Sequence, residues 1–179
     1  MMGMVFTELL DMVEERYSLD LVDDVLAKAG VSGSYTSVGY YEDADLVGIV
    51  VALSEESNIA VPDLLHLFGT HLFSRFVTLY PMFFDPHESA PSFLEGLESH
   101  VHTEVRKLYA NAHPPIFTFD ANPDGTYALT YQSNRGLWQF AQGLLEACLK
   151  HYGQAITLAS IEDQSEGAGT KVRFNLVPA

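Results

Sequence analysis

The chain has 179 residues, 47% hydrophobic and 18% charged, a composition typical of one globular domain with a sizeable core. Its formal net charge is −15, from 24 acidic and 9 basic side chains, so it lacks the basic surface that nucleic acid or anionic lipid requires. The single cysteine, Cys148, excludes an intrachain disulfide and a zinc site built from cysteines.

The N-terminal segment carries acidic residues from Glu8 onward and does not begin with a basic stretch, so it does not resemble a signal peptide. No apolar run approaches the ~20 residues of a membrane-spanning helix. We therefore expect a cytoplasmic protein without a membrane partner.

The first part of the chain follows the helical period. Apolar spacing predicts four helices: 5–13, 21–26, 45–54 and 62–76. Gly30 ends the second helix, and Pro62 occupies the first turn of the fourth. Ser92 is a candidate N-cap for a fifth helix that runs to about Tyr109.

The pattern changes at Pro114–Pro115. Alternating residues predict four strands: 116–119, 126–131, 154–161 and 171–177. An amphipathic helix over 137–149 separates the second strand from the third. We therefore predict an α+β fold in one domain, 1–179, with a helical lobe (about 1–112) and an α/β lobe (about 113–179) that contains an antiparallel sheet and a long helix.

The seven histidines are the candidate metal ligands, although a single histidine is more often a surface or structural residue. His100 and His102 belong to one predicted helix. Residues two apart point to different sides, so this pair does not readily share one ion. One of them remains a candidate for a lone axial ligand. Both flank the apolar stripe at about 100° on a helical wheel, which does not choose between them.

Tyr131, Ser133 and Arg135 form the pattern Y-x-S-x-R where a predicted strand turns into a helix. In an extended chain, alternate residues face one side. The arginine and the two hydroxyl groups would then converge on a ligand that carries carboxylates. The alternative, which the pattern alone favours, is that Ser133 or Asn134 caps the helix while Arg135 is exposed.

Together these motifs resemble the heme–nitric oxide/oxygen binding (H-NOX) family, which includes the heme domain of soluble guanylate cyclase and stand-alone bacterial sensors. The segment HTEVRKLYANAHPP, from His102 to Pro115, is similar to the family's proximal helix and the proline pair behind it. The resemblance implies that heme b (iron protoporphyrin IX) is held by His102 and distorted by Pro115. It also implies that Tyr131, Ser133 and Arg135 hold the heme propionates.

Heme is a large apolar disc, so its site also needs apolar walls. The expected distal wall consists of residues that would serve equally well as ordinary core: Val5, Leu9, Leu72, Phe76, Phe140 and Leu144. Gly3 and Phe68–Gly69 also resemble the family. Oxygen-binding members carry a distal tyrosine on the helix after Y-x-S-x-R, where this chain has Phe140. The resemblance therefore implies binding of nitric oxide and carbon monoxide and not of oxygen.

The implied function is a nitric oxide sensor without catalysis of its own. It would signal through rupture of the iron–His102 bond to a separate enzyme, a histidine kinase or a cyclic-di-GMP enzyme. Two other classes remain open. A heme redox protein would need a distal acid–base group or a sixth ligand. A heme-free module for small hydrophobes is open because the C-terminal lobe also resembles 4-vinyl reductase-like domains.

Overall fold

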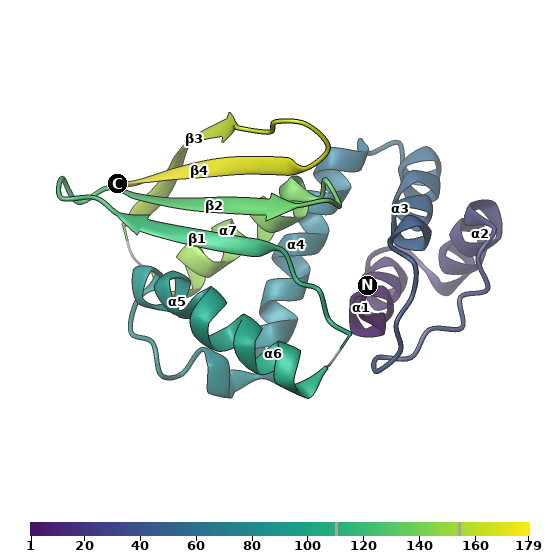
Figure 1. The fold of residues 1–179 in the computed structure, drawn as a ribbon. Coiled ribbons are helices and arrows are strands. Elements are labelled where there is room, and N and C mark those ends of the chain that lie inside the picture. Colours follow the sequence, from purple (N-terminus) through teal and green to yellow (C-terminus); the bar gives the residue numbers. More distant parts are fainter. Residues whose placement is uncertain (110, 154) are drawn as a thin grey trace.

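A computed structural model describes residues 1–109, 111–153 and 155–179 (Figure 1). The helical part comprises α1 (Gly3–Arg16), α2 (Leu19–Ala29), α3 (Asp43–Ser57), α4 (Val61–Leu79), η1 (Pro81–Phe83), α5 (Ala90–Gly96), the π-helical segment η2 (Leu97–His102) and α6 (Thr103–Leu108). The rest forms β1 (Ile116–Ala121), β2 (Tyr127–Ser133), α7 (Trp138–His151), β3 (Ile156–Asp163) and β4 (Thr170–Pro178). The predicted α+β class is confirmed.

The ends of the elements follow local chemistry. Gly30 ends α2 in the left-handed conformation, as predicted, with φ 71°. The predicted cap Ser92 is wrong, because the hydroxyl group of Ser89 accepts the N–H of Ser92 and α5 begins at Ala90. Gln154, the predicted first residue of the third strand, lies outside the described residues. No helix among the described residues has the length and apolar character to cross a bilayer.

The four strands form one antiparallel sheet in the order β1-β2-β4-β3. In Figure 1 the helices α5 and α7 lie beneath this sheet, and both contact its strands. Every second residue of β4 is buried, namely Val172, Phe174 and Leu176, as the period of a half-buried strand requires. Tyr131 of β2 lies opposite Val172, which places it on the same covered face.

Within the described residues, the core consists of two hydrophobic clusters. One unites α1 to α4 around Phe6 and Phe68, and the other packs Phe84 and Phe93 against sheet residues such as Phe174. The second cluster therefore draws on residues from both sides of position 113, where the division between the lobes stays a prediction from the sequence.

Helices α4 and α7 cross at a pair of glycines. A Cβ atom on Gly69 would lie 2.1 Å from the carbonyl oxygen of Phe140, and one on Gly143 would lie 2.0 Å from that of His66. Only glycine permits such an approach between two backbones. The crossing brings the faces of α4 and α7 that carry Leu72 and Phe140 to one place in the molecule.

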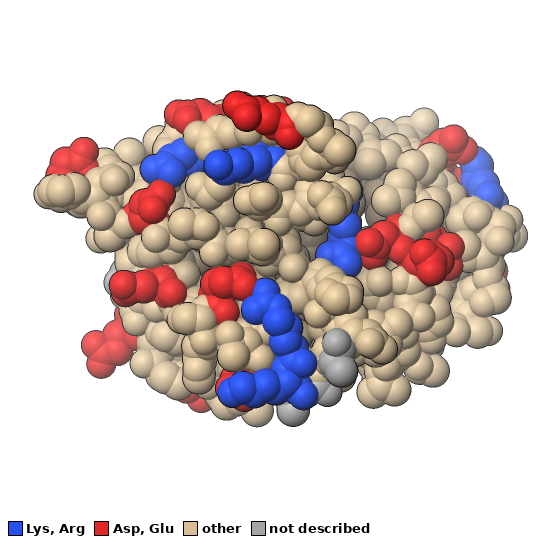
Figure 2. Space-filling model, in the orientation of Figure 1, with Lys and Arg blue, Asp and Glu red and all other residues tan. Residues whose placement is uncertain are grey.

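Basic side chains lie beside acidic ones on the face drawn in Figure 2. The ion pairs include Arg173 with Asp120 at 2.8 Å and Lys107 with Glu104 at 2.6 Å. The positive charges of Arg173 and Lys107 are thus each balanced by a neighbouring carboxylate.

Candidate cofactor site

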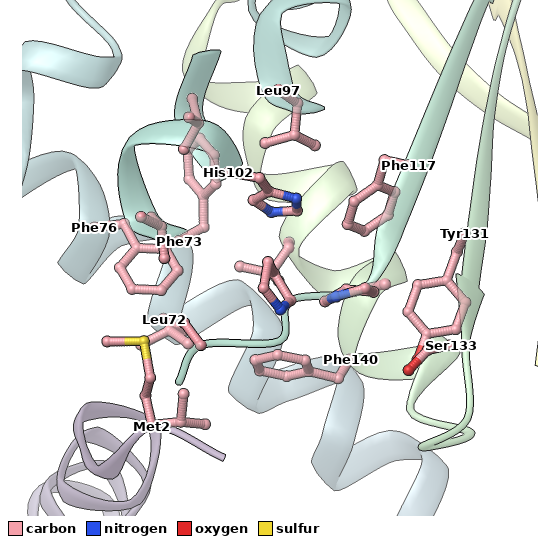
Figure 3. A pocket seen from close by; sticks show the side chains of 18 of the residues that line it. Met2, Leu72, Phe73, Phe76, Leu97, His102, Phe117, Tyr131, Ser133 and Phe140 are labelled. Atoms are coloured by element: carbon pink, nitrogen blue, oxygen red, sulfur yellow. The ribbon is translucent and has the colours of Figure 1, made fainter. Parts of the chain in front are cut away.

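An apolar cavity of about 330 Å³ lies where the helical elements meet the sheet and α7 (Figure 3). Ligand cavities in proteins typically measure about 300–1,000 Å³. Ten of the predicted site residues line it: Val5, Leu72, Phe76, His102, Pro115, Tyr131, Ser133, Arg135, Phe140 and Leu144. The eleventh, Leu9, is 1% exposed and packs into the cluster of α1 to α4, outside the lining described.

His102 is the last residue of η2, and its ring projects into the cavity (Figure 3). Its Nδ1 lies 2.8 Å from Oε2 of Glu98. Because a carboxylate only accepts, we assign the hydrogen to Nδ1, which leaves the lone pair on Nε2. Burial lowers the pKa of His102 more than Glu98 raises it, so the ring is neutral at neutral pH. Neutral imidazole is the form that binds a metal.

His100 takes a different position from His102. It is exposed, its ring lies 6.3 Å from that of Phe83, and it is not among the residues described as lining the cavity. The segment between Leu97 and His102 is π-helical, so residues there are not spaced at the angles of an α-helix. The structure therefore separates two histidines that the helical wheel could not.

All three Y-x-S-x-R residues line the cavity. The hydroxyl oxygen of Tyr131 accepts the N–H of Leu137 at 3.2 Å, and that of Ser133 accepts the N–H of Arg135 at 3.2 Å. Each hydroxyl group therefore keeps its own hydrogen to donate. Burial raises the pKa of Tyr131, which keeps this group protonated. The alternative interpretation is wrong, because α7 begins after Leu137, and the Arg135 side chain is only 21% exposed.

Two neighbours hold the guanidinium group of Arg135, and neither could be found from sequence patterns. Its Nε donates to Oδ2 of Asp43 at 2.6 Å, and a terminal nitrogen donates to the carbonyl oxygen of His113. Asp43 begins α3, 92 residues earlier in the chain. The guanidinium group thus stands at the cavity with part of its donor capacity already used.

Phe140 lies across the cavity from His102, next to Leu72 (Figure 3). Its ring stacks on that of Phe68, with centroids 5.1 Å apart. Tyr80 also lines the cavity, but its hydroxyl group donates to Sδ of Met4 at 3.3 Å. The wall opposite the histidine is therefore formed largely by apolar side chains.

These residues fit a heme. The cavity presents the neutral imidazole of His102 with its lone pair on Nε2, a wide apolar wall opposite it, and a cation with two hydroxyl groups. A porphyrin that carries iron and two propionates needs these three things. Pro114 and Pro115 also line the cavity. They follow directly after His113, whose carbonyl oxygen accepts a hydrogen bond from Arg135.

Comparison with known proteins gives a consistent result. The Haem-NO-binding family model matches residues 2–160. The H-NOX protein of Shewanella woodyi, solved with IWP-051 in the Fe(II)CO state, is 34% identical, with 100% of this chain and 95% of that chain covered and a TM-score of 0.83. The unliganded Fe(II) H-NOX protein from K. algicida is 29% identical, with 99% and 97% covered and a TM-score of 0.88.

More distant relatives agree. The H-NOX protein from S. oneidensis in the Fe(II)NO state is 26% identical, with 99% of both chains covered and a TM-score of 0.86. Soluble guanylate cyclase gcy-34 of Caenorhabditis elegans is 24% identical over 156 residues, which is 84% of this chain but 23% of the cyclase. Since the family model spans most of the residues that build the cavity, the chain belongs to the Haem-NO-binding, or H-NOX, family.

Proposed function

We propose that this chain is a nitric oxide sensor that holds heme b through His102. The observation that carries the proposal is the position of the His102 ring in an apolar cavity, with its Nδ1 bonded to Glu98 and with Phe140 on the opposite wall. Bound ferrous heme would supply the iron to which a gas binds. The chain would supply the axial ligand, the grip on the cofactor and the choice of gas.

The grip combines charge and shape. Arg135 offers a fork of donors to a propionate, and the hydroxyl groups of Tyr131 and Ser133 would add further donors. Val5, Leu72, Phe76 and Leu144 would cover the distal side of the ring, and Pro115 would press on it. A flat cofactor would therefore be held at one edge by polar bonds and over its faces by apolar contacts.

The choice of gas follows from the chemistry of the distal wall. Bound oxygen becomes partly anionic, and a hydroxyl donor beside it would contribute roughly 1.5–3 kcal/mol. Phe140 offers no such donor, and the hydroxyl group of Tyr80 is occupied by Met4. Nitric oxide and carbon monoxide depend much less on a donor. The site therefore favours these two gases over oxygen.

Signalling requires a partner with different affinities for the liganded and unliganded forms. We propose that nitric oxide would break the bond between His102 and the iron of a bound heme, that Pro115 would no longer hold the cofactor distorted, and that the lobes would then shift. A separate enzyme, a histidine kinase or a cyclic-di-GMP enzyme, would read this change. The chain itself would act as a sensing domain without catalysis.

The test is an absorption spectrum of the purified ferrous protein, titrated with each gas. We expect a Soret band, shifts with nitric oxide and carbon monoxide, and no stable oxygen complex in air. A protein that takes up no heme would support the module for small hydrophobes instead. A spectrum with two protein ligands on iron would support the redox protein.

A further inference from the structure

We propose that Glu98 is a positioning residue that fixes the ring of His102 and strengthens its bond to iron, while Arg106 weakens this effect. The inference rests on the proposed function and adds two residues that would regulate it. Through Glu98 and Arg106 the protein would set how readily a gas on the opposite side breaks the iron–His102 bond.

The Glu98 carboxylate lies at the centre of a small network. Oε2 accepts from Nδ1 of His102 at 2.8 Å and from the backbone N–H of Phe117 at 3.3 Å. Oε1 accepts from the guanidinium group of Arg106. Phe117 belongs to β1, so the carboxylate ties the helix that bears the histidine to the sheet. Three donors from separate places hold the carboxylate in one orientation.

The local backbone supports this arrangement. Glu98 and His102 both lie in the π-helical segment η2, and the hydroxyl group of Thr103 donates to the carbonyl oxygen of Glu98 at 3.2 Å. Single π-helical turns are rare and occur often at functional sites. Here the turn holds the carboxylate and the ring in contact, with the side chain of His102 only 13% exposed.

The chemical consequence follows from the shared hydrogen. A carboxylate that accepts from Nδ1 fixes the tautomer and raises the electron density on Nε2, which makes the imidazole a stronger ligand. Arg106 draws negative charge toward the other oxygen of the same carboxylate. The two side chains therefore act on His102 with opposite signs, which no purely structural role would produce.

The experiment compares three variants of the heme-loaded ferrous protein by the iron–histidine stretching frequency in resonance Raman spectra. Glu98→Gln keeps the shape but removes the charge, and the frequency should fall. Arg106→Gln should raise it. Glu104→Gln is the matched control, because Glu104 lies on α6 with Arg106, pairs with Lys107 and forms no hydrogen bond or ion pair with His102 or Glu98 among the described residues. It should leave the frequency unchanged.

Two further readouts accompany the spectra. The midpoint potential should rise in Glu98→Gln and fall in Arg106→Gln, by about 60 mV for each ten-fold change in the ratio of ferric to ferrous ligand affinity. Glu98→Ala should lose heme about 10- to 100-fold faster than the wild type, as expected when a partner of a metal ligand is removed.

Unchanged frequencies in both Glu98→Gln and Arg106→Gln, or shifts of the same sign, would overturn the inference and leave the proposed function intact. If Glu98→Gln fails to fold, Arg106→Gln alone decides, and an unchanged frequency overturns the inference. A wild-type protein that binds no heme, or binds it without His102, would overturn the proposed function and this inference together.

Discussion

Nε of Arg135 lies 2.6 Å from Oδ2 of Asp43, which joins the first turn of α3 to the segment that leads into α7 at the lining of the cavity. The carboxylate also pairs with the amino group of Met1 at 3.0 Å. A single acidic side chain thus orients the cation that we assign to the heme propionates. The polar end of the site depends on residues from three separate parts of the chain.

Replacing Arg135 by alanine should leave most of the purified protein without heme. A hydrogen bond to a charged group contributes roughly 1.5–3 kcal/mol, so the affinity for heme should fall about ten- to a hundred-fold. The ratio of Soret to protein absorbance measures the loss. Arg173→Ala is the control, because Arg173 pairs with Asp120 and lies outside the described cavity lining. A fully loaded Arg135→Ala protein would contradict the assignment of the clamp.

Asp43→Asn should lower the urea midpoint of unfolding at neutral pH more than in acid. Burial alone would raise the pKa of Asp43, but its bonds to the Met1 amino group and to Arg135 outweigh this, and the native pKa is lowered from 3.8. The carboxylate therefore contributes stability above this value and loses it as the pH falls through the lower native pKa. The difference between wild type and variant should shrink over that acidic range. A constant difference would show that Asp43 does not act through its charge.

His102→Gly should lose the bond that anchors the heme, and added imidazole should restore the spectrum of a ferrous heme with one nitrogen ligand. His100→Gly is the control, because His100 is exposed and lies outside the described lining. It should keep heme at the wild-type level. The reverse result, with heme lost only in His100→Gly, would overturn the ligand assignment.

The choice between these two histidines marks one limit of sequence reasoning. Apolar spacing predicts the helices, the strands and the α+β class, because the spacing of apolar residues reflects which face is buried. A wheel at about 100° per residue assumes an α-helix, whereas Leu97–His102 is π-helical. Only the resemblance to the family distinguishes His102. The structure then places it in the cavity.

Other parts of the site leave no local pattern at all. Asp43 meets Arg135 across 92 residues, and the N–H of Phe117 meets Glu98 across 19, so neither contact follows from helical or strand spacing.

Leu9 shows that a correctly identified buried face does not by itself identify a cavity residue. It follows Val5 by one turn of α1, yet only Val5 lines the cavity, because α1 packs against α2 and α4 farther along. Periodicity identifies a buried face without saying what that face meets.

Because α4 and α7 cross at close range, one added methyl group at this crossing should markedly lower the free energy of unfolding. In Gly143→Ala the new Cβ atom would lie 2.0 Å from the carbonyl oxygen of His66 and 3.0 Å from the backbone nitrogen of Thr70. Overpacking of this kind destabilises a protein by about 1–3 kcal/mol or more, and heme content should fall as the distal wall moves.

The control for this change is Gly48→Ala in α3, where the nearest atom would be an ordinary 3.9 Å away. Alanine is a better helix former than glycine by about 0.5–1 kcal/mol, so this variant should unfold at a higher urea concentration than the wild type. Equal stability of the two variants would contradict the close backbone contact.

Phe140→Tyr should test the basis of gas selection, because it adds one hydroxyl group to the wall opposite His102 (Figure 3). A donor beside partly anionic oxygen contributes roughly 1.5–3 kcal/mol, which corresponds to about ten- to a hundred-fold in affinity. The dissociation constant for oxygen should fall by this factor, while that for carbon monoxide should change much less.

Phe68→Tyr is a matched control, because Phe68 stacks on Phe140 but is fully buried and is not among the described lining residues. It should not increase oxygen affinity. Gas titrations of the ferrous proteins, followed by absorption, measure both constants. A wild-type protein that already forms a stable oxygen complex would show that another donor reaches the gas. Tyr80→Phe would then identify or exclude the Tyr80 hydroxyl group, which donates to Sδ of Met4 in this structure.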